Sequence, residues 1–171
     1  MNAEEANAID TVVAQSGNLR DQLILKLMMS GLRVGEIRGA IINAAGEIVI
    51  TSLKSPDGEF VISPNKSRTA ILQAYVQKNG IKPGDFLFPS KPDVKSPEPA
   101  ASFAKRFKKW ASHAEVDTGL TPHSMRKLVM SRLVKSLQPA DIQHVQRLMG
   151  HSSPKMTQYY ASKIISDLDN Q

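Results

Sequence analysis

Apolar residues recur at helical intervals through the first part of the chain. Residues 4–15 and 19–30 are therefore predicted helices, with Asn18 as the N-cap of the second helix and Gly31 at its end. A third helix is predicted to begin near Leu32. The wide apolar face of the second helix consists of Leu19, Leu23, Ile24, Leu27 and Met28.

From Gly46 onward the pattern changes to the alternation and the β-branched residues that are typical of strands. Residues 46–54 and 59–63 are predicted strands, and residues 55–58 (SPDG) are the turn that joins them into a hairpin. Helical spacing returns in residues 65–80, which are predicted to form the next helix.

The remaining chain is predicted to be helical after a proline-rich loop. Residues 81–99 form that loop, in which residues 86–88 (FLF) are expected to touch the core. Residues 121–137 form a helix with Thr121 as its cap and Pro122 at its first position. The other predicted helices are 101–114, 139–150 and 155–168. We expect a mainly α fold with a small antiparallel β-sheet (α+β), in a single domain over residues 1–171.

The composition excludes several classes of protein. The chain has 171 residues, enough to bury a core, and its 41% hydrophobic and 22% charged residues are ordinary for a globular domain. It has no cysteine, so disulfides and thiolate metal sites are excluded. Its acidic N-terminus is unlike a signal peptide, and no apolar run is long enough to span a membrane. A cytoplasmic location is therefore the default expectation.

The charge balance suggests a polyanionic partner, with nucleic acid as the leading candidate. Lys and Arg number 22 against 16 Asp and Glu, which gives a formal net charge of +6 and a pI near 9.6. Residues 105–110 (KRFKKW) place four cations around Phe107 and Trp110, so one side of this helix can dock while the other reaches phosphates. A solvated basic face is the alternative. The candidate DNA contacts are Lys66, Arg68, Lys105, Arg106, Lys108, Lys109 and Lys127.

Three short stretches carry residues that suit an anionic ligand. His123 and Arg126, in HSMR, are three positions apart near a predicted helix start, so both can donate hydrogen bonds to one anionic oxygen. Arg33 in GLRVGE and His151 in LMGHSS stand at helix junctions. Each stretch also has a plain structural explanation: an exposed helix start, a loop histidine, or a surface Arg33 paired with Glu36.

Five features follow one another in a fixed order: GLRVGE, a hairpin lysine, HSMR, LMGHSS and a tyrosine nine positions after His151. In this order they resemble the tyrosine recombinases, also called the phage integrase family, over residues 4–162. Members of this family cut DNA with a tyrosine nucleophile, hold a 3′-phosphotyrosine link and rejoin the cut strand to another. The resemblance implies the tyrosine recombinase catalytic-domain fold and a reaction that needs no metal and no nucleotide cofactor.

The resemblance assigns catalytic roles to the two arginine motifs. Arg33 matches the first catalytic arginine, and Glu36 matches the acidic residue that usually follows it as a support. His123 and Arg126 match the His-x-x-Arg pair of the family. A guanidinium presents donors in a rigid fork that suits a phosphate, whose charge grows in the transition state.

The resemblance also identifies the remaining catalytic residues. His151 matches a position that the family fills with His or Trp, and Tyr160 rather than Tyr159 matches the nucleophile. The family's lysine lies at the turn of a β-hairpin, for which Lys54 and Lys66 compete. We favour Lys54, because it falls at the turn of the predicted hairpin, whereas Lys66 begins the helix that follows. A lysine there can give a proton to the 5′-hydroxyl leaving group.

Partners and assembly follow from the same resemblance. We expect double-stranded DNA as the partner, no membrane, a monomer alone and a tetramer on paired DNA sites. Protomers would then exchange the C-terminal tail through Ile164, Ile165 and Leu168. Members usually carry another DNA-binding domain before this one, so the chain is expected to be a fragment, with a naturally short member as the alternative.

Other functions explain the motifs less well. A type IB topoisomerase uses similar chemistry to relax DNA, but the spacing of the motifs favours the recombinase. A catalytically inactive DNA-binding relative is opposed by the intact catalytic set, and a plain helical interaction domain leaves the motifs unexplained. Integration, excision, chromosome resolution and transposition stay open as biological roles.

Overall fold

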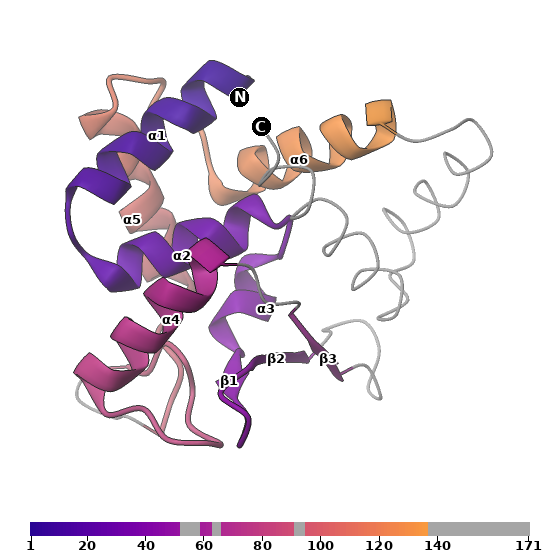
Figure 1. The fold of residues 1–171 in the computed structure, drawn as a ribbon. Helices are drawn as coiled ribbons and strands as arrows, with labels where there is room; N and C mark the ends of the chain where they lie inside the picture. Colours follow the sequence, from indigo (N-terminus) through magenta and orange to yellow (C-terminus); the bar gives the residue numbers. More distant parts are fainter. Residues whose placement is uncertain (52–58, 63–65, 91–94, 137–171) are drawn as a thin grey trace.

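The structure is a computed structural model that describes residues 1–51, 59–62, 66–90 and 95–136 (Figure 1). Its elements in chain order are α1 (Ala3–Gln15), α2 (Leu19–Met29), α3 (Val34–Arg38), β1 (Ile41–Ile42), β2 (Ile48–Thr51), β3 (Glu59–Val61), α4 (Lys66–Asn79), α5 (Ala100–His113) and α6 (Pro122–Ser136). The expected fold class, mainly α with a small antiparallel sheet, is confirmed. The helices predicted at 139–150 and 155–168 lie outside the described residues. Within the described ranges, no helix is long and apolar enough to cross a membrane.

Helix α2 is the centre of the domain, because α1, α3, α4 and α6 all pack against it (Figure 1). Asn18 caps its start, as predicted, by accepting a hydrogen bond of 3.1 Å from the amide of Asp21. The sequence predicts one apolar face, but Leu25 lies outside that face and is buried as fully as Leu23 and Leu27. Because helices pack on more than one side of α2, its buried surface is wider than one apolar face, while Gln22 and Lys26 remain partly exposed.

The sheet contains the predicted hairpin and a third strand that the sequence pattern did not predict. Strand β2 lies in the middle and pairs antiparallel with β1 on one side and with β3 on the other. Val49 marks this register, since it stands opposite Ile41 in β1 and Val61 in β3. Strand β1 directly follows the short helix α3, and its two residues are too few to show an alternation.

The predicted contact between residues 86–88 and the core is confirmed. Leu87 and Phe88 are fully buried, and the Leu87 amide donates to the Ala40 carbonyl at 2.8 Å. Phe86 forms a bridge to Ile41 in β1. The proline-rich loop therefore holds the edge of the sheet against the helices.

Candidate active site

The junction between α2 and α3, residues 30–33, carries the first predicted catalytic arginine. Gly31 turns the chain there with a φ of +79°, a conformation that favours glycine. A Cβ atom on Gly31 would lie 2.9 Å from Met130 Cε and 3.3 Å from Val129 Cγ1, both in α6. The glycine therefore allows α6 to lie directly against the junction.

Arg33 is fixed by a single carboxylate at the start of α3. The Glu36 side chain accepts the Arg33 amide at 2.7 Å through Oε2 and the Arg33 guanidinium at 3.2 Å through Oε1. Glu36 is only 2% exposed, whereas the Arg33 side chain is 24% exposed. One buried carboxylate thus caps the helix and holds the guanidinium, which remains accessible in part.

The start of α6 is set by the local signals that the sequence predicts. Pro122 is its first residue, and Thr121 precedes it as the cap. The Ser124 amide donates to Thr121 Oγ1 at 3.4 Å, and the Thr121 amide donates to Ser124 Oγ at 3.1 Å. This start places Arg126 in the first turns of α6, on the side that meets the junction.

Arg126 points back at the junction and lies beside Arg33. Its Nη1 atom donates to the carbonyl oxygen of Gly31, and its side chain is half-buried. Burial, followed by the positive charge of Arg33, lowers the pKa of Arg126 below its ordinary value, and Glu36 offsets this only in part. In the part of the chain that the structure describes, no ion pair joins Arg126 to a carboxylate. We call Arg33, Glu36 and Arg126, which the sequence analysis predicts as catalytic or supporting residues, the active-site cluster: it holds two guanidinium groups and one carboxylate.

Of the other predicted catalytic residues, the structure describes one and leaves three outside the described ranges. His123 is exposed and lies one turn before Arg126 on α6, so the two share a face of the helix. Lys54, His151 and Tyr160 lie outside the described residues, as does Tyr159. The structure thus brings Arg126 of α6 beside Arg33 and Glu36, although α6 is far from α3 in the sequence.

A model of the phage integrase family matches residues 1–164 of the sequence. This chain belongs to the phage integrase family. It is 26% identical over 169 residues to a tyrosine recombinase of Agathobacter rectalis, and the aligned region covers 95% of this chain and 54% of that protein. It is 30% identical over 155 residues to the tyrosine recombinase XerD of Shewanella oneidensis, and the aligned region covers 82% of this chain and 48% of that protein. The chain spans about half the length of the curated relatives it matches.

Solved structures of integrases and recombinases share this fold. The crystal structure of XerA recombinase superposes with a TM-score of 0.66 at 20% identity, covering 100% of this chain and 62% of that one. A lambda integrase dimer bound to a COC′ core site gives a TM-score of 0.58 at 19% identity, covering 94% of this chain and 47% of that one. At these identities the likeness establishes the fold of this integrase family member.

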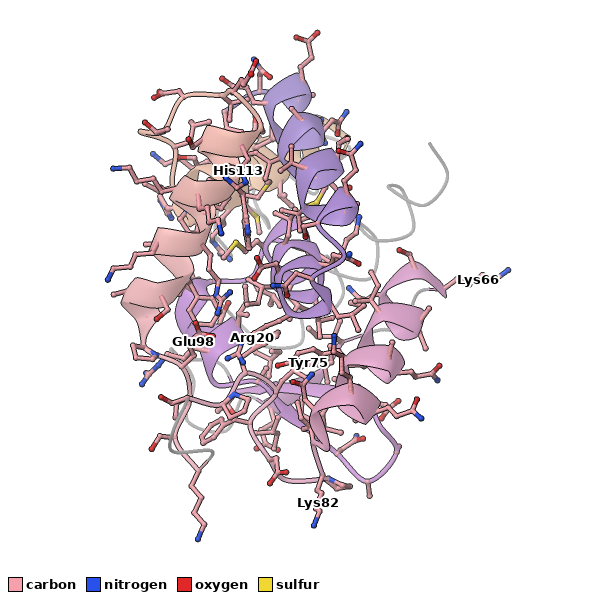
Figure 2. The ribbon with its side chains drawn as sticks, turned by 90° about the vertical axis from the view of Figure 1, so that its left-hand side faces the viewer. Arg20, Lys66, Tyr75, Lys82, Glu98 and His113 are labelled. Carbon is pink, nitrogen blue, oxygen red and sulfur yellow. The ribbon has the colours of Figure 1, made fainter. Side chains whose placement is uncertain are left out.

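The candidate DNA contacts of this integrase family member divide into exposed and internal side chains. The exposed group is Lys66, Lys105, Lys108, Lys109 and Lys127, and Lys66 projects into solvent at the start of α4 (Figure 2). By contrast, Arg68 is 3% exposed and donates to Ser30 Oγ at 3.2 Å. The Arg106 side chain is 29% exposed, and its guanidinium is bound by the carboxylates of Asp21 and Glu98. We therefore assign Arg68 and Arg106 roles in contacts within the protein.

A second arginine cluster joins distant parts of the integrase fold and was not predicted from the sequence. Arg20 Nη2 lies 2.5 Å from Glu98 Oε2, and Arg106 Nη2 lies 2.9 Å from Glu98 Oε1 (Figure 2). Arg106 Nη1 also pairs with Asp21 Oδ1 at 2.7 Å, and Trp110 donates to Asp21 Oδ2 at 3.0 Å. We call Arg20, Asp21, Glu98 and Arg106 the structural cluster. The contact between Asp21 and Trp110 joins residues 89 positions apart, so no local sequence pattern could reveal this cluster.

Proposed function

We propose that this chain is the catalytic part of a site-specific tyrosine recombinase that breaks and rejoins DNA strands. The observation that carries the proposal is the active-site cluster, in which Arg33 pairs with Glu36 while Arg126, beside Arg33, makes no ion pair among the described residues. The net positive charge of this cluster is held at a half-buried place, where a charge without a partner is unfavourable. The phosphodiester group of DNA supplies the missing negative charge, and two guanidinium forks match its two nonbridging oxygens.

The proposed reaction begins with Tyr160 as the nucleophile. Its phenol has an ordinary pKa of about 10, so it loses its proton as it attacks. The phenolate oxygen bonds to phosphorus, the bond from phosphorus to the 5′-oxygen breaks, and a 3′-phosphotyrosine link forms. Attack by a 5′-hydroxyl of another strand reverses these steps and releases Tyr160. The covalent link keeps the bond energy, which is why rejoining needs no nucleotide cofactor.

The remaining residues handle protons and charge in this proposal. Lys54 gives a proton to the departing 5′-oxygen as the general acid. His123 and His151 donate hydrogen bonds to the phosphoryl oxygens, on which charge builds up in the transition state. His123 suits this role because it is exposed and lies one turn from Arg126 on the same helix.

The proposed contacts with double-stranded DNA come from the exposed lysines of α4, α5 and α6. Such contacts to phosphates fix the position of the protein on the duplex. We further propose that the protein is a monomer in solution and forms a tetramer on paired DNA sites, with exchange of the C-terminal tail. Sedimentation that shows a stable tetramer without DNA contradicts this assembly.

The first prediction tests the nucleophile. The substrate is a nicked duplex whose sequence is randomised around the nick. Cleavage near the nick releases a short end that cannot be rejoined, so the covalent adduct accumulates. A denaturing gel measures the amount of adduct. We expect the adduct to vanish in Tyr160→Phe, because the attacking oxygen is gone. Tyr159→Phe is the matched control and should keep the adduct. An adduct that survives in Tyr160→Phe removes Tyr160 from the mechanism.

The second prediction tests the lysine. Lys54→Ala should slow adduct formation by about 10²-fold, within the range for loss of a general acid, while Lys66→Ala slows it far less. A substrate with sulfur in place of the 5′-bridging oxygen should restore the rate of Lys54→Ala, because a thiolate leaves without being protonated. Equal effects of the two substitutions, or no rescue by sulfur, would contradict the assignment of Lys54.

A further inference from the structure

Arg68 is an arginine in the first turn of α4 whose side chain lies inside the protein. It is 3% exposed, and its Nη1 atom donates to Ser30 Oγ at 3.2 Å. Arginine is almost never fully buried unless its charge and donors are engaged. Because α4 packs against α2, this side chain reaches the end of the central helix from the side.

The contact with Ser30 falls on the segment that supports the active-site cluster. Ser30 is the C-cap of α2 and is itself buried, with 6% exposure. Its hydroxyl donates to the Lys26 carbonyl at 2.9 Å, so the same oxygen that accepts from Arg68 is tied to the last turn of α2. The next residue, Gly31, offers its carbonyl to Arg126, and Arg33 follows two positions later.

The hydrogen bond between Arg68 and Ser30 bears on this segment through geometry. The groups that shift the pKa of Arg126 are burial first, then Arg33, then Glu36, and Arg68 is not one of them. Arg68 does, however, hold Ser30 at one end of residues 30–33, while Glu36 holds Arg33 at the other end. The segment between them presents the Gly31 carbonyl that orients Arg126.

We propose that Arg68 is a positioning residue for the recombination reaction: through Ser30 it fixes residues 30–33, and thereby sets Arg33 and Arg126 against the phosphate. This inference rests on the proposed function for its kinetic consequence. A shift of about 1 Å in a catalytic group can slow a reaction by up to about 10²-fold without any loss of binding.

The test uses the 171-residue chain and two independent ways to break the contact. Arg68→Met removes the donor at similar length, and Ser30→Ala removes the acceptor with minimal change in volume. We expect each to slow single-turnover adduct formation roughly tenfold, with the DNA dissociation constant unchanged. Arg68→Lys should recover part of the rate. The double variant should be no slower than the slower single variant, because both substitutions remove the Arg68–Ser30 hydrogen bond.

The control is Gln73→Ala, which removes an exposed side chain from the same helix and should leave the rate unchanged. A spectroscopic readout separates positioning from general loss of stability: the side-chain Nε–H resonance of Arg126 should move in Arg68→Met and Ser30→Ala but not in Gln73→Ala. Urea unfolding of every variant gives the folded fraction, to which each rate is normalised.

Two outcomes overturn the inference. One is a normal rate and an unmoved Arg126 resonance in Ser30→Ala; the other is strictly additive effects of the two substitutions. Failure of the proposed function gives a different result, because the unsubstituted chain would then form no adduct. The Arg126 resonance would still report whether Arg68 positions the Arg126 side chain.

Discussion

The structural cluster and the active-site cluster are built from the same side chains but have different charge balances. In the structural cluster two guanidinium groups meet two carboxylates, and both oxygens of Glu98 are taken by arginines. In the active-site cluster two guanidinium groups lie near one carboxylate, Glu36, and among the described residues only Arg33 forms an ion pair with it. The first cluster is therefore neutral, whereas the second, counted over the described residues, has one more positive than negative charge.

The pKa of Arg106 in the structural cluster and the pKa of Arg126 in the active-site cluster are shifted in opposite directions. Burial lowers the pKa of Arg106, but the hydrogen bonds and the negative charge of Glu98, with those of Asp21, outweigh burial and raise it. For Arg126, burial and the neighbouring Arg33 act together and lower the pKa, and Glu36 does not outweigh them. Both side chains stay charged at neutral pH, because an arginine pKa lies so far above 7. The difference thus measures unsatisfied charge, which marks the cluster that is suited to an anionic ligand.

The largest expected effect comes from removing the carboxylate that both arginines of the structural cluster share. Glu98→Gln should lower the free energy of unfolding by about 3 kcal/mol, because breaking a buried ion pair leaves its arginine partners without this counter-charge. We expect no larger loss, because both arginines are partly exposed. Urea titration measures this. Glu115→Gln, at an exposed carboxylate, is the control and should change little. If Glu98→Gln unfolds like the control, the structural cluster does not stabilise the fold.

The next effect tests the active-site cluster and should appear in the rate rather than in stability. Arg126→Lys keeps the charge but loses the fork, so single-turnover adduct formation should fall by about 10²-fold, as for loss of one transition-state donor. The urea midpoint should move little, because Arg126 makes no ion pair among the described residues. If Arg126→Lys reacts at the normal rate but unfolds at lower urea, then Arg126 stabilises the fold and does not act in the reaction. The two clusters would then not differ in function.

The smallest effect separates residues on one helix. Lys108→Ala and Lys109→Ala, on the exposed face of α5, should each reduce the slope of log K against log salt for DNA binding by about one unit. Arg106→Ala should leave that slope unchanged, because its guanidinium is bound to Glu98 and Asp21. Filter binding over a range of salt measures all three. Equal slopes for the three variants would show that α5 does not meet the phosphates.

Features that depend on neighbouring residues could be predicted from the sequence. The cap at Asn18, the start of α6 at Pro122 and the β2–β3 hairpin all depend on residues a few positions apart. Strand β1 was missed because two residues give no period. The burial of Leu25 was missed because it depends on how many helices surround α2.

The same distinction applies to the candidate site. The pairing of Arg33 with Glu36 is a contact at i, i+3, so the spacing alone suggests it. The approach of Arg126 to Gly31 spans 95 positions and was not predicted; the resemblance to a family only assigned Arg33 and Arg126 to one catalytic set. The internal roles of Arg68 and Arg106 had no signal at all, because a basic residue on a predicted helix looks the same whether it faces solvent or a distant carboxylate.

The glycine at the α2–α3 junction has a consequence for the way the protein is made. Gly31 and Arg33 leave the ribosome long before Arg126, so a nascent chain that ends at α5 carries one arginine of the pair without the other. The two meet only when α6 settles onto the bare backbone at Gly31. An unfinished chain therefore has not yet brought Arg33 and Arg126 together, so under the proposed function its phosphate site forms only after α6 has docked.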